Sequence, residues 1–117
     1  MLIVEDEAII AFELKVILER AGYVVTDVAY TAEEAMKAAE AERPDVILMD
    51  VLLKGEEDGI HIAERINGLF KVPILFITGN THLINEESIK NTENFIIMTK
   101  PPLESDIIKN VQLLSSR

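Results

Sequence analysis

Five side chains that suit phosphoryl-transfer chemistry follow or end short apolar runs of the sequence. Glu5 and Asp6 follow the first run, Asp50 ends the third, Thr78 the fourth and Lys100 the fifth. Singly, an acid in such a place is often a cap or turn residue, and a lysine before proline is often a solvated loop charge. Together, three carboxylates in a small cleft would repel one another unless a cation or a proton neutralised them. The set therefore predicts a cation site.

Mg²⁺ is the cation that suits these donors. It is a hard, oxygen-preferring ion, and its protein sites often combine few carboxylates with several waters and an incoming phosphate. In phosphoryl transfer the carboxylate of Asp50 would be the nucleophile and would form an aspartyl phosphate. The metal ion, the ammonium group of Lys100 and the hydroxyl group of Thr78 would then each contact one phosphoryl oxygen.

The elements that must position these side chains are predicted by an alternation of short apolar runs with longer helical patterns. This alternation is typical of βα units around a parallel sheet, and the central runs are apolar throughout, as strands buried on both faces are. Ligands of such sheets bind beyond the carboxyl ends of the strands, where the five side chains are expected. The expected strands are residues 2–4, 24–29, 46–49, 74–77 and 95–98.

Two helices are predicted between the first three strands. The first carries apolar residues at three- and four-residue spacing and ends before Gly22, a favourable residue just after a helix. The second begins with the capping-box pattern of Thr31 and Glu34 and ends at the pair Arg43-Pro44. Both are expected to cover the sheet.

The second half of the chain predicts two further sheet-covering helices and one weak one. An apolar stripe over residues 62–70 indicates the third helix, and the last helix is expected to begin near Pro102. Residues 81–91 are polar and predict only a short or mobile fourth helix. Gly55, Gly59 and Gly79 are interpreted as isolated turn glycines, since they form no phosphate-binding fingerprint.

Four segments of this chain carry a resemblance to a known family. They are Leu2-Ile3-Val4-Glu5-Asp6-Glu7, Val46-Ile47-Leu48-Met49-Asp50, Ile77-Thr78-Gly79 and Lys100-Pro101. In order and at matching intervals they resemble the receiver domain of two-component response regulators, over essentially the whole chain. The resemblance implies a flavodoxin-like, doubly wound (βα)5 fold with strand order 2-1-3-4-5, and residues 1–117 are expected to form a single receiver domain.

The resemblance also implies roles for individual residues. Asp50 would accept a phosphoryl group from a sensor histidine kinase or a phosphotransfer protein, and Thr78, Gly79 and Lys100 would take part in the switch or the chemistry. Asp6 and Asp50 would bind Mg²⁺ directly. Glu5 would bind it directly or through water, and the backbone carbonyl group of Leu52 would complete the protein ligands. The Lys100-Pro101 peptide bond is commonly cis in that family.

This sequence departs from the family's usual pattern at several positions. The acidic pair is Glu5-Asp6 rather than two aspartates, and Gly79 replaces the commoner alanine. Ile97 stands where many relatives have an aromatic switch residue, and the loop 53–59 is longer than usual. None of these departures removes a reacting group.

Composition narrows the function further. The chain has 117 residues, a net charge of -10 and no cysteine, which argues against direct nucleic-acid binding, disulfides and thiolate zinc sites. No apolar stretch approaches the roughly 20 residues of a membrane span, so we expect a soluble, cytoplasmic protein. His61 and His82 have no partner at metal-ligand spacing, and Met36, Met49 and Met98 are expected to fill the core.

The function expected from these observations is a signalling module that catalyses its own phosphorylation and dephosphorylation but has no turnover substrate. Alternatives are a phosphorylation-independent scaffold and a small phosphotransferase, although Asp50 lacks a second acid two residues later. A flavodoxin-like electron carrier would place a Ser-, Thr- and Gly-rich loop where this chain has Glu5-Asp6-Glu7. An attached output domain or a separate target, and a monomer or a dimer, all remain open.

Overall fold

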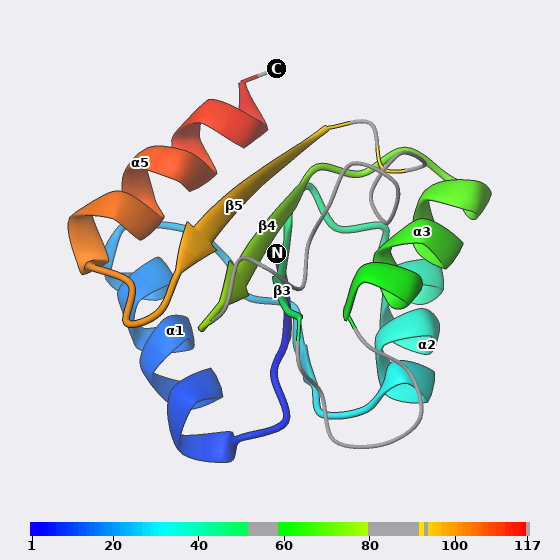
Figure 1. Ribbon diagram of the computed structural model, residues 1–117, viewed down its shortest axis with the longest axis horizontal. Helices are drawn as coiled ribbons and strands as arrows, with labels where there is room; N and C mark the ends of the chain where they lie inside the picture. The colour runs from blue at the N-terminus through cyan, green and yellow to red at the C-terminus, as the bar shows by residue number, and fades with distance from the viewer. Residues whose placement is uncertain (52–58, 80–91, 93, 117) are drawn as a thin grey trace.

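One parallel sheet forms the centre of the molecule. The computed structural model describes residues 1–51, 59–79, 92 and 94–116. The sheet order is β2-β1-β3-β4-β5, which confirms the flavodoxin-like order that the resemblance implied (Figure 1). The strands are β1 (Leu2–Val4), β2 (Asp27–Ala29), β3 (Ile47–Asp50), β4 (Ile74–Thr78) and β5 (Phe95–Thr99).

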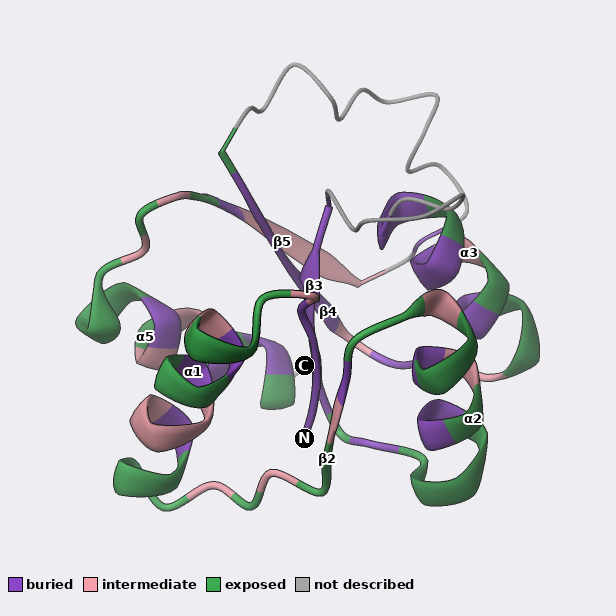
Figure 2. Cartoon of the chain, turned by 90° about the horizontal axis from the view of Figure 1, so that it is seen from below, coloured by how far each residue is buried: buried purple, intermediate pink, exposed green. Residues whose placement is uncertain are grey.

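Helices cover both faces of the sheet in pairs. Helices α1 (Ala8–Arg20) and α5 (Glu104–Ser115) lie on one face, and α2 (Ala32–Glu42) and α3 (Gly59–Leu69) lie on the other (Figures 1 and 2). The expected fourth helix, residues 81–91, and His82 lie outside the described residues. Within the part of the chain that the structure describes, every helix is too short or too polar to span a bilayer.

Side-chain alternation along the strands divides the core into two clusters. Leu2 and Val4 of β1 join the cluster under α2 and α3, whereas Ile3 joins the cluster under α1 and α5. The same alternation holds in β3, where Met49 faces α2 and α3 and Leu48 faces α1 and α5. Burial on both faces explains why the central strands are apolar without interruption (Figure 2).

Several local sequence signals form the structures they predict. Gly22 has a φ of 94° just after α1, and the Tyr23 amide donates a hydrogen bond back to the Leu18 carbonyl oxygen. The Thr31 hydroxyl accepts a hydrogen bond from the Glu34 amide at 3.1 Å and so caps α2. Helix α2 ends at Glu42, directly before the predicted stop, because the next residue turns into the left-handed region.

The expected strand over residues 24–29 is too long, since β2 comprises only Asp27–Ala29. Leu2 is the first residue of β1 to pair with β2, and its partner is Asp27, so residues before Asp27 have no strand beside them. They bind the chain start instead: the Met1 ammonium group donates to the Val24 carbonyl oxygen at 2.7 Å. The last helix begins at Glu104, two residues after the expected start near Pro102.

Gly59 is the first residue of α3 and is buried, so its interpretation as an isolated turn glycine is wrong. Its amide donates a hydrogen bond to the Val51 carbonyl oxygen at 2.8 Å. A Cβ atom at this position would collide with the Asp50 carbonyl oxygen and approach the Met49 Cγ atom to 2.9 Å. The absence of a side chain therefore lets α3 begin directly against the end of β3.

This contact predicts opposite effects for alanine at the two glycines of α3. Gly59→Ala should lower the free energy of unfolding by about 1–3 kcal/mol, because the new methyl group forces backbone apart at the end of β3. Gly68→Ala is the matched control, since a Cβ atom there meets nothing within 4 Å, and it should leave stability unchanged or raise it by up to about 1 kcal/mol. Urea denaturation of both variants measures the difference, and equal effects would contradict the proposed contact.

Candidate metal centre

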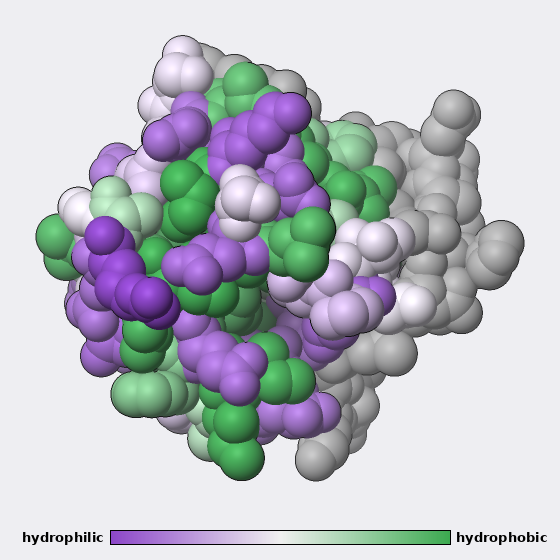
Figure 3. Space-filling view, turned by 90° about the vertical axis from the view of Figure 1, so that its left-hand side faces the viewer, coloured by the Kyte–Doolittle hydropathy of each residue, from purple (hydrophilic) through white to green (hydrophobic). Residues whose placement is uncertain are grey.

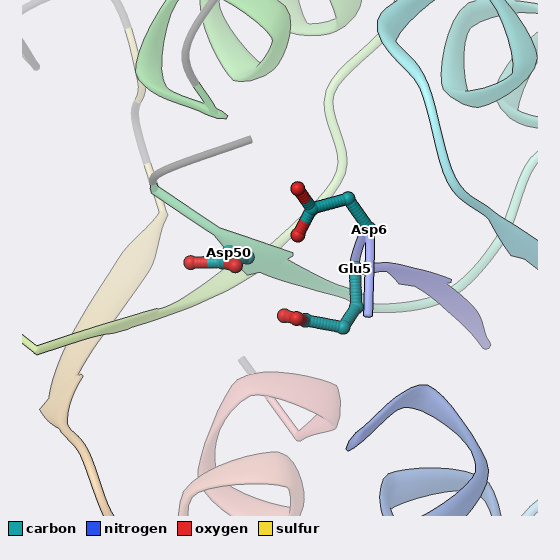
Figure 4. A group of neighbouring side chains, drawn as sticks. All are labelled: Glu5, Asp6 and Asp50. Atoms are coloured by element: carbon teal, nitrogen blue, oxygen red, sulfur yellow. The ribbon is translucent and has the colours of Figure 1, made fainter. Parts of the chain in front are cut away.

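The strand register brings Glu5 beside Asp50. The β1–β3 pairing ends with Val4 opposite Met49, so the next residue of each strand lies side by side at the carboxyl edge of the sheet. Both acids are buried, with exposed fractions of 2% for Glu5 and 5% for Asp50, and Asp6 is half-buried. One carboxylate oxygen of each of the three lies within 4.8 Å of the other two. Figure 4 shows the three side chains side by side.

Strand alternation decides from which side each acid approaches. Side chains along a strand alternate between the two faces of the sheet, so Glu5 lies on the same face as Ile3, and Asp50 on the same face as Leu48. This is the face covered by α1 and α5. Asp6 lies beyond the end of β1, and in Figure 4 its carboxylate and that of Glu5 lie above and below the level of Asp50. Two neighbouring strands thus direct three carboxylates into one small volume.

Lys100 supplies the positive charge of the site. It directly follows β5, and its Nζ atom lies 3.3 Å from the Asp50 Oδ2 atom and 3.9 Å from the Glu5 Oε2 atom. The Lys100 amide donates a 2.8 Å hydrogen bond to the Thr78 carbonyl oxygen, which ties the two strand ends together. The peptide bond between Lys100 and Pro101 is cis, the isomer that the resemblance implied.

The electrostatics of the site act most strongly on Glu5. Burial raises the pKa of the Glu5 carboxyl group to about 8, and a hydrogen bond to Asp50 and the negative charge of Asp50 act in the same direction. The positive charge of Lys100 and a hydrogen bond from the Glu7 amide lower the pKa and oppose these effects. Among the described residues the charge of Lys100 alone does not balance three ionised carboxylates, which favours a proton on Glu5 or a bound cation at this site.

The donor set fits a magnesium ion. All three acids offer hard oxygen atoms, they come from a rigid sheet edge, and their mutual repulsion would be relieved by a divalent charge. The fourth expected donor, the backbone carbonyl group of Leu52, lies outside the described residues. Thr78 is buried at the end of β4, and Gly79 follows it at the surface.

Sequence reasoning missed one residue of this site. Gly59 fixes the backbone of Asp50 from the α3 side, although it lies nine positions along the chain. Its only sequence signal is its place at the start of an apolar helical stripe. Many glycines in such places belong to turns, so this signal alone does not identify Gly59 as a helix residue. Gly55 lies outside the described residues.

Comparison with known proteins identifies the family. The family model described as the response regulator receiver domain matches residues 1–112. The chain belongs to the response regulator receiver family. Receiver domains are signalling domains rather than conventional enzymes; they generally bind Mg²⁺ and typically interact with histidine kinases and output domains.

Individual relatives agree with this membership. The chain is 32% identical over 117 residues to the transcriptional regulatory protein PdtaR of Mycobacterium tuberculosis, and 40% identical over 79 residues, 67% of the chain, to the phyllosphere-induced regulator PhyR of Methylorubrum extorquens. It spans only 57% of the length of PdtaR and 30% of that of PhyR.

A solved receiver structure has the same fold. It is the N-terminal domain of a response regulator/sensory box/GGDEF three-domain protein from Carboxydothermus hydrogenoformans, which is 31% identical with a TM-score of 0.89. The alignment covers 98% of this chain and 92% of that one. The receiver architecture therefore extends over nearly all of the chain.

The raised pKa of Glu5 predicts a pH-dependent stability in the metal-free receiver. A carboxyl group whose pKa is higher in the folded state stabilises the fold below its unfolded pKa, and this stability is lost as the pH rises toward about 8. Glu5→Gln keeps the shape of the side chain and removes the titration. At pH 8 without metal, the variant should therefore melt about 4 °C or more above the wild type.

The same comparison at pH 5 is the control, because Glu5 is then protonated in the folded wild type and the two melting temperatures should converge. Calorimetry in a chelating buffer provides the measurement. A constant difference across this pH range would show that Glu5 is not the titrating group.

Proposed function

We propose that this receiver accepts a phosphoryl group on Asp50 in a Mg²⁺-dependent reaction, with the phosphohistidine of a sensor kinase or phosphotransfer protein as donor. The observation that carries the proposal is the position of the Asp50 carboxylate, which lies between two further acids and a lysine 3.3 Å away. A phosphoryl acceptor needs an anionic oxygen, a bound cation and a second positive charge for the incoming phosphoryl oxygens.

In this proposal Glu5, Asp6 and Asp50 hold the metal ion, with Leu52 as an expected backbone ligand. A bound Mg²⁺ supplies charge neutralisation for the phosphoryl oxygens. The carboxylates provide the negative charge that retains the ion, and the sheet edge fixes their spacing. The carboxylates of Glu5 and Asp6 approach Asp50 from different sides, so an ion between the three acids could contact all of them (Figure 4).

The chemical step is an in-line displacement at phosphorus. A carboxylate oxygen of Asp50 forms the new O–P bond as the N–P bond of the phosphohistidine breaks, and the imidazole leaves with the bonding electron pair and takes up a proton. Lys100 transfers its ion pair from Asp50 to a phosphoryl oxygen, and the Thr78 hydroxyl donates a hydrogen bond to another. Attack by water on the same phosphorus returns Asp50 to its starting state, so the domain both forms and hydrolyses its phosphate.

The protein around the domain is part of the proposal. Residues 1–117 act as one receiver in the cytoplasm, and the phosphorylated state signals to an output domain or a target protein. The relatives named above are about twice as long or longer, which supports an attached output region. A regulatory rather than a catalytic role follows from the family.

Phosphorylation by a small donor tests the proposed acceptor. Incubation with acetyl phosphate and Mg²⁺ should add one phosphoryl group, measured by intact mass, and the gain should disappear with a chelator or in Asp50→Asn. Asp45→Asn is the matched control, because Asp45 is exposed just before β3, at the other end of the strand from Asp50. It should be phosphorylated like the wild type.

No mass gain in a folded, metal-binding protein would overturn the acceptor proposal and favour a phosphorylation-independent scaffold. A gain that persists in Asp50→Asn would move the acceptor to another side chain.

The position of Lys100 predicts opposite effects on metal binding and on phosphorylation. Lys100→Met removes a positive charge 3.3 Å from Asp50, so Mg²⁺ should bind about three- to tenfold more tightly. Phosphorylation by acetyl phosphate should nevertheless become at least about tenfold slower, because a phosphoryl oxygen loses its partner. Calorimetric titration with Mg²⁺ and a time course of intact mass measure the two quantities, and a parallel loss of both would contradict the role given to Lys100.

A further inference from the structure

A largely apolar cavity lies on the α1 and α5 side of the acidic site. Its volume is about 280 Å³, and its walls come from α1, α5, the ends of β3 and β4, and the segment after β5. Wall side chains include Ile10, Leu14 and Ile17 of α1 and Ile107 of α5. Figure 3 shows this face, where hydrophobic side chains lie among hydrophilic ones.

The cavity interrupts a region that is otherwise closely packed. Leu14 and Ile107 belong to the buried cluster under α1 and α5, and Ile10 and Ile17 pack against that cluster while remaining half-exposed. The cavity is partly open to solvent, and an apolar cavity of roughly 150 Å³ already suffices to bind benzene. This cavity therefore has the size and the lining of a small-molecule site.

The charged side chains of the cavity select the ligand class. Two ionised acids, Glu13 and Asp50, line it, and the one cation among its described lining residues is Lys100, which is already paired with Asp50. Glu5 lines it as well, but its raised pKa leaves it largely uncharged at pH 7. An anion would therefore meet an excess of negative charge, which would attract a positively charged head group. Burial of a short aliphatic chain among the isoleucines would supply the rest of the affinity.

We propose that this cavity is a second binding site of the domain and takes a small aliphatic ammonium ion, with its chain between α1 and α5 and its head group at the acidic side chains. Such a site differs from the phosphoryl-acceptor site in chemistry, because its contacts are mainly apolar and it needs no metal. It shares Glu5 and Asp50 with that site, so a bound ammonium ion would contact the same carboxylates from the α1 and α5 side.

The test uses three probes of equal chain length: n-hexylammonium, hexanol and hexanoate. Each is titrated into the protein in metal-free buffer at pH 7, and methyl and amide chemical shifts are followed by NMR.

Hexylammonium should bind saturably with a dissociation constant of about 1 mM or tighter, with the largest shifts at Leu48, Ile77 and Ile107. Hexanol should bind at least about threefold more weakly and hexanoate least. Equal binding of all three would overturn the ammonium assignment, and no saturation would overturn the site.

Variants locate the binding. Ile17→Phe fills the cavity and should weaken hexylammonium at least about tenfold, and Ile10→Phe is a second filling variant in case the first does not fold. Ile9→Phe is the matched control, because Ile9 lies on the same helix, is 76% exposed and does not line the cavity. Unchanged affinity in the folded filling variants would place the probe elsewhere and reject the proposal.

Glu13→Gln tests the head group without touching the acceptor site. It should weaken hexylammonium several-fold and leave hexanol unchanged, and equal effects on the two would contradict the charge contribution. Since the titrations contain neither Mg²⁺ nor a phosphoryl donor, their outcome is independent of whether Asp50 is phosphorylated.

Discussion

Repulsion among three carboxylates at one sheet edge is the constraint to which the rest of the site responds. Glu5, Asp6 and Asp50 converge because β1 and β3 are neighbouring strands in register. Each acid stays near the end of its own strand whichever rotamer its side chain adopts. Lys100 follows β5, which is two strands away from β3, and its side chain reaches Asp50 with the Nζ atom 3.3 Å from the Oδ2 atom. Burial and the neighbouring Asp50 raise the pKa of the Glu5 carboxyl group. The fold holds these charges together because the two apolar clusters beneath them stabilise the strands.

Because side chains alternate along each strand, different functional groups lie on the two faces of the sheet. Glu5, Asp50 and the cavity share the face under α1 and α5. Thr78 lies two residues after Phe76 and therefore on the same face as Phe76, which is covered by α2 and α3. Ile97 packs on that second face as well. Glu5, Asp50 and Lys100 therefore lie toward one side of the sheet, whereas Asp6 and the hydroxyl group expected to contact a phosphoryl oxygen lie toward the other.

Much of this arrangement could be predicted from the sequence, because strand ends are local features. Asp50, Thr78 and Lys100 were placed at the sheet edge by the apolar runs before them, and the Thr31 cap and Gly22 by their local turn chemistry. The extent of β2 could not be predicted, since it depends on where β1 begins to offer hydrogen bonds. The collision that keeps Gly59 free of a side chain is a tertiary contact with no pattern in sequence.

The packing around Asp50 is asymmetric, and this asymmetry limits how the site can respond to a larger group. On the α3 side, Gly59 lies so close that not even a methyl group fits against the Asp50 carbonyl oxygen. At the end of β4, a Cβ atom on Gly79 would meet no other atom within 4 Å among the described residues. The backbone of Asp50 is therefore held by close contact on the α3 side, whereas the backbone at Gly79, directly after Thr78, has no such contact. Because the Thr78 carbonyl oxygen accepts the Lys100 amide, movement there also moves the lysine that balances the charge.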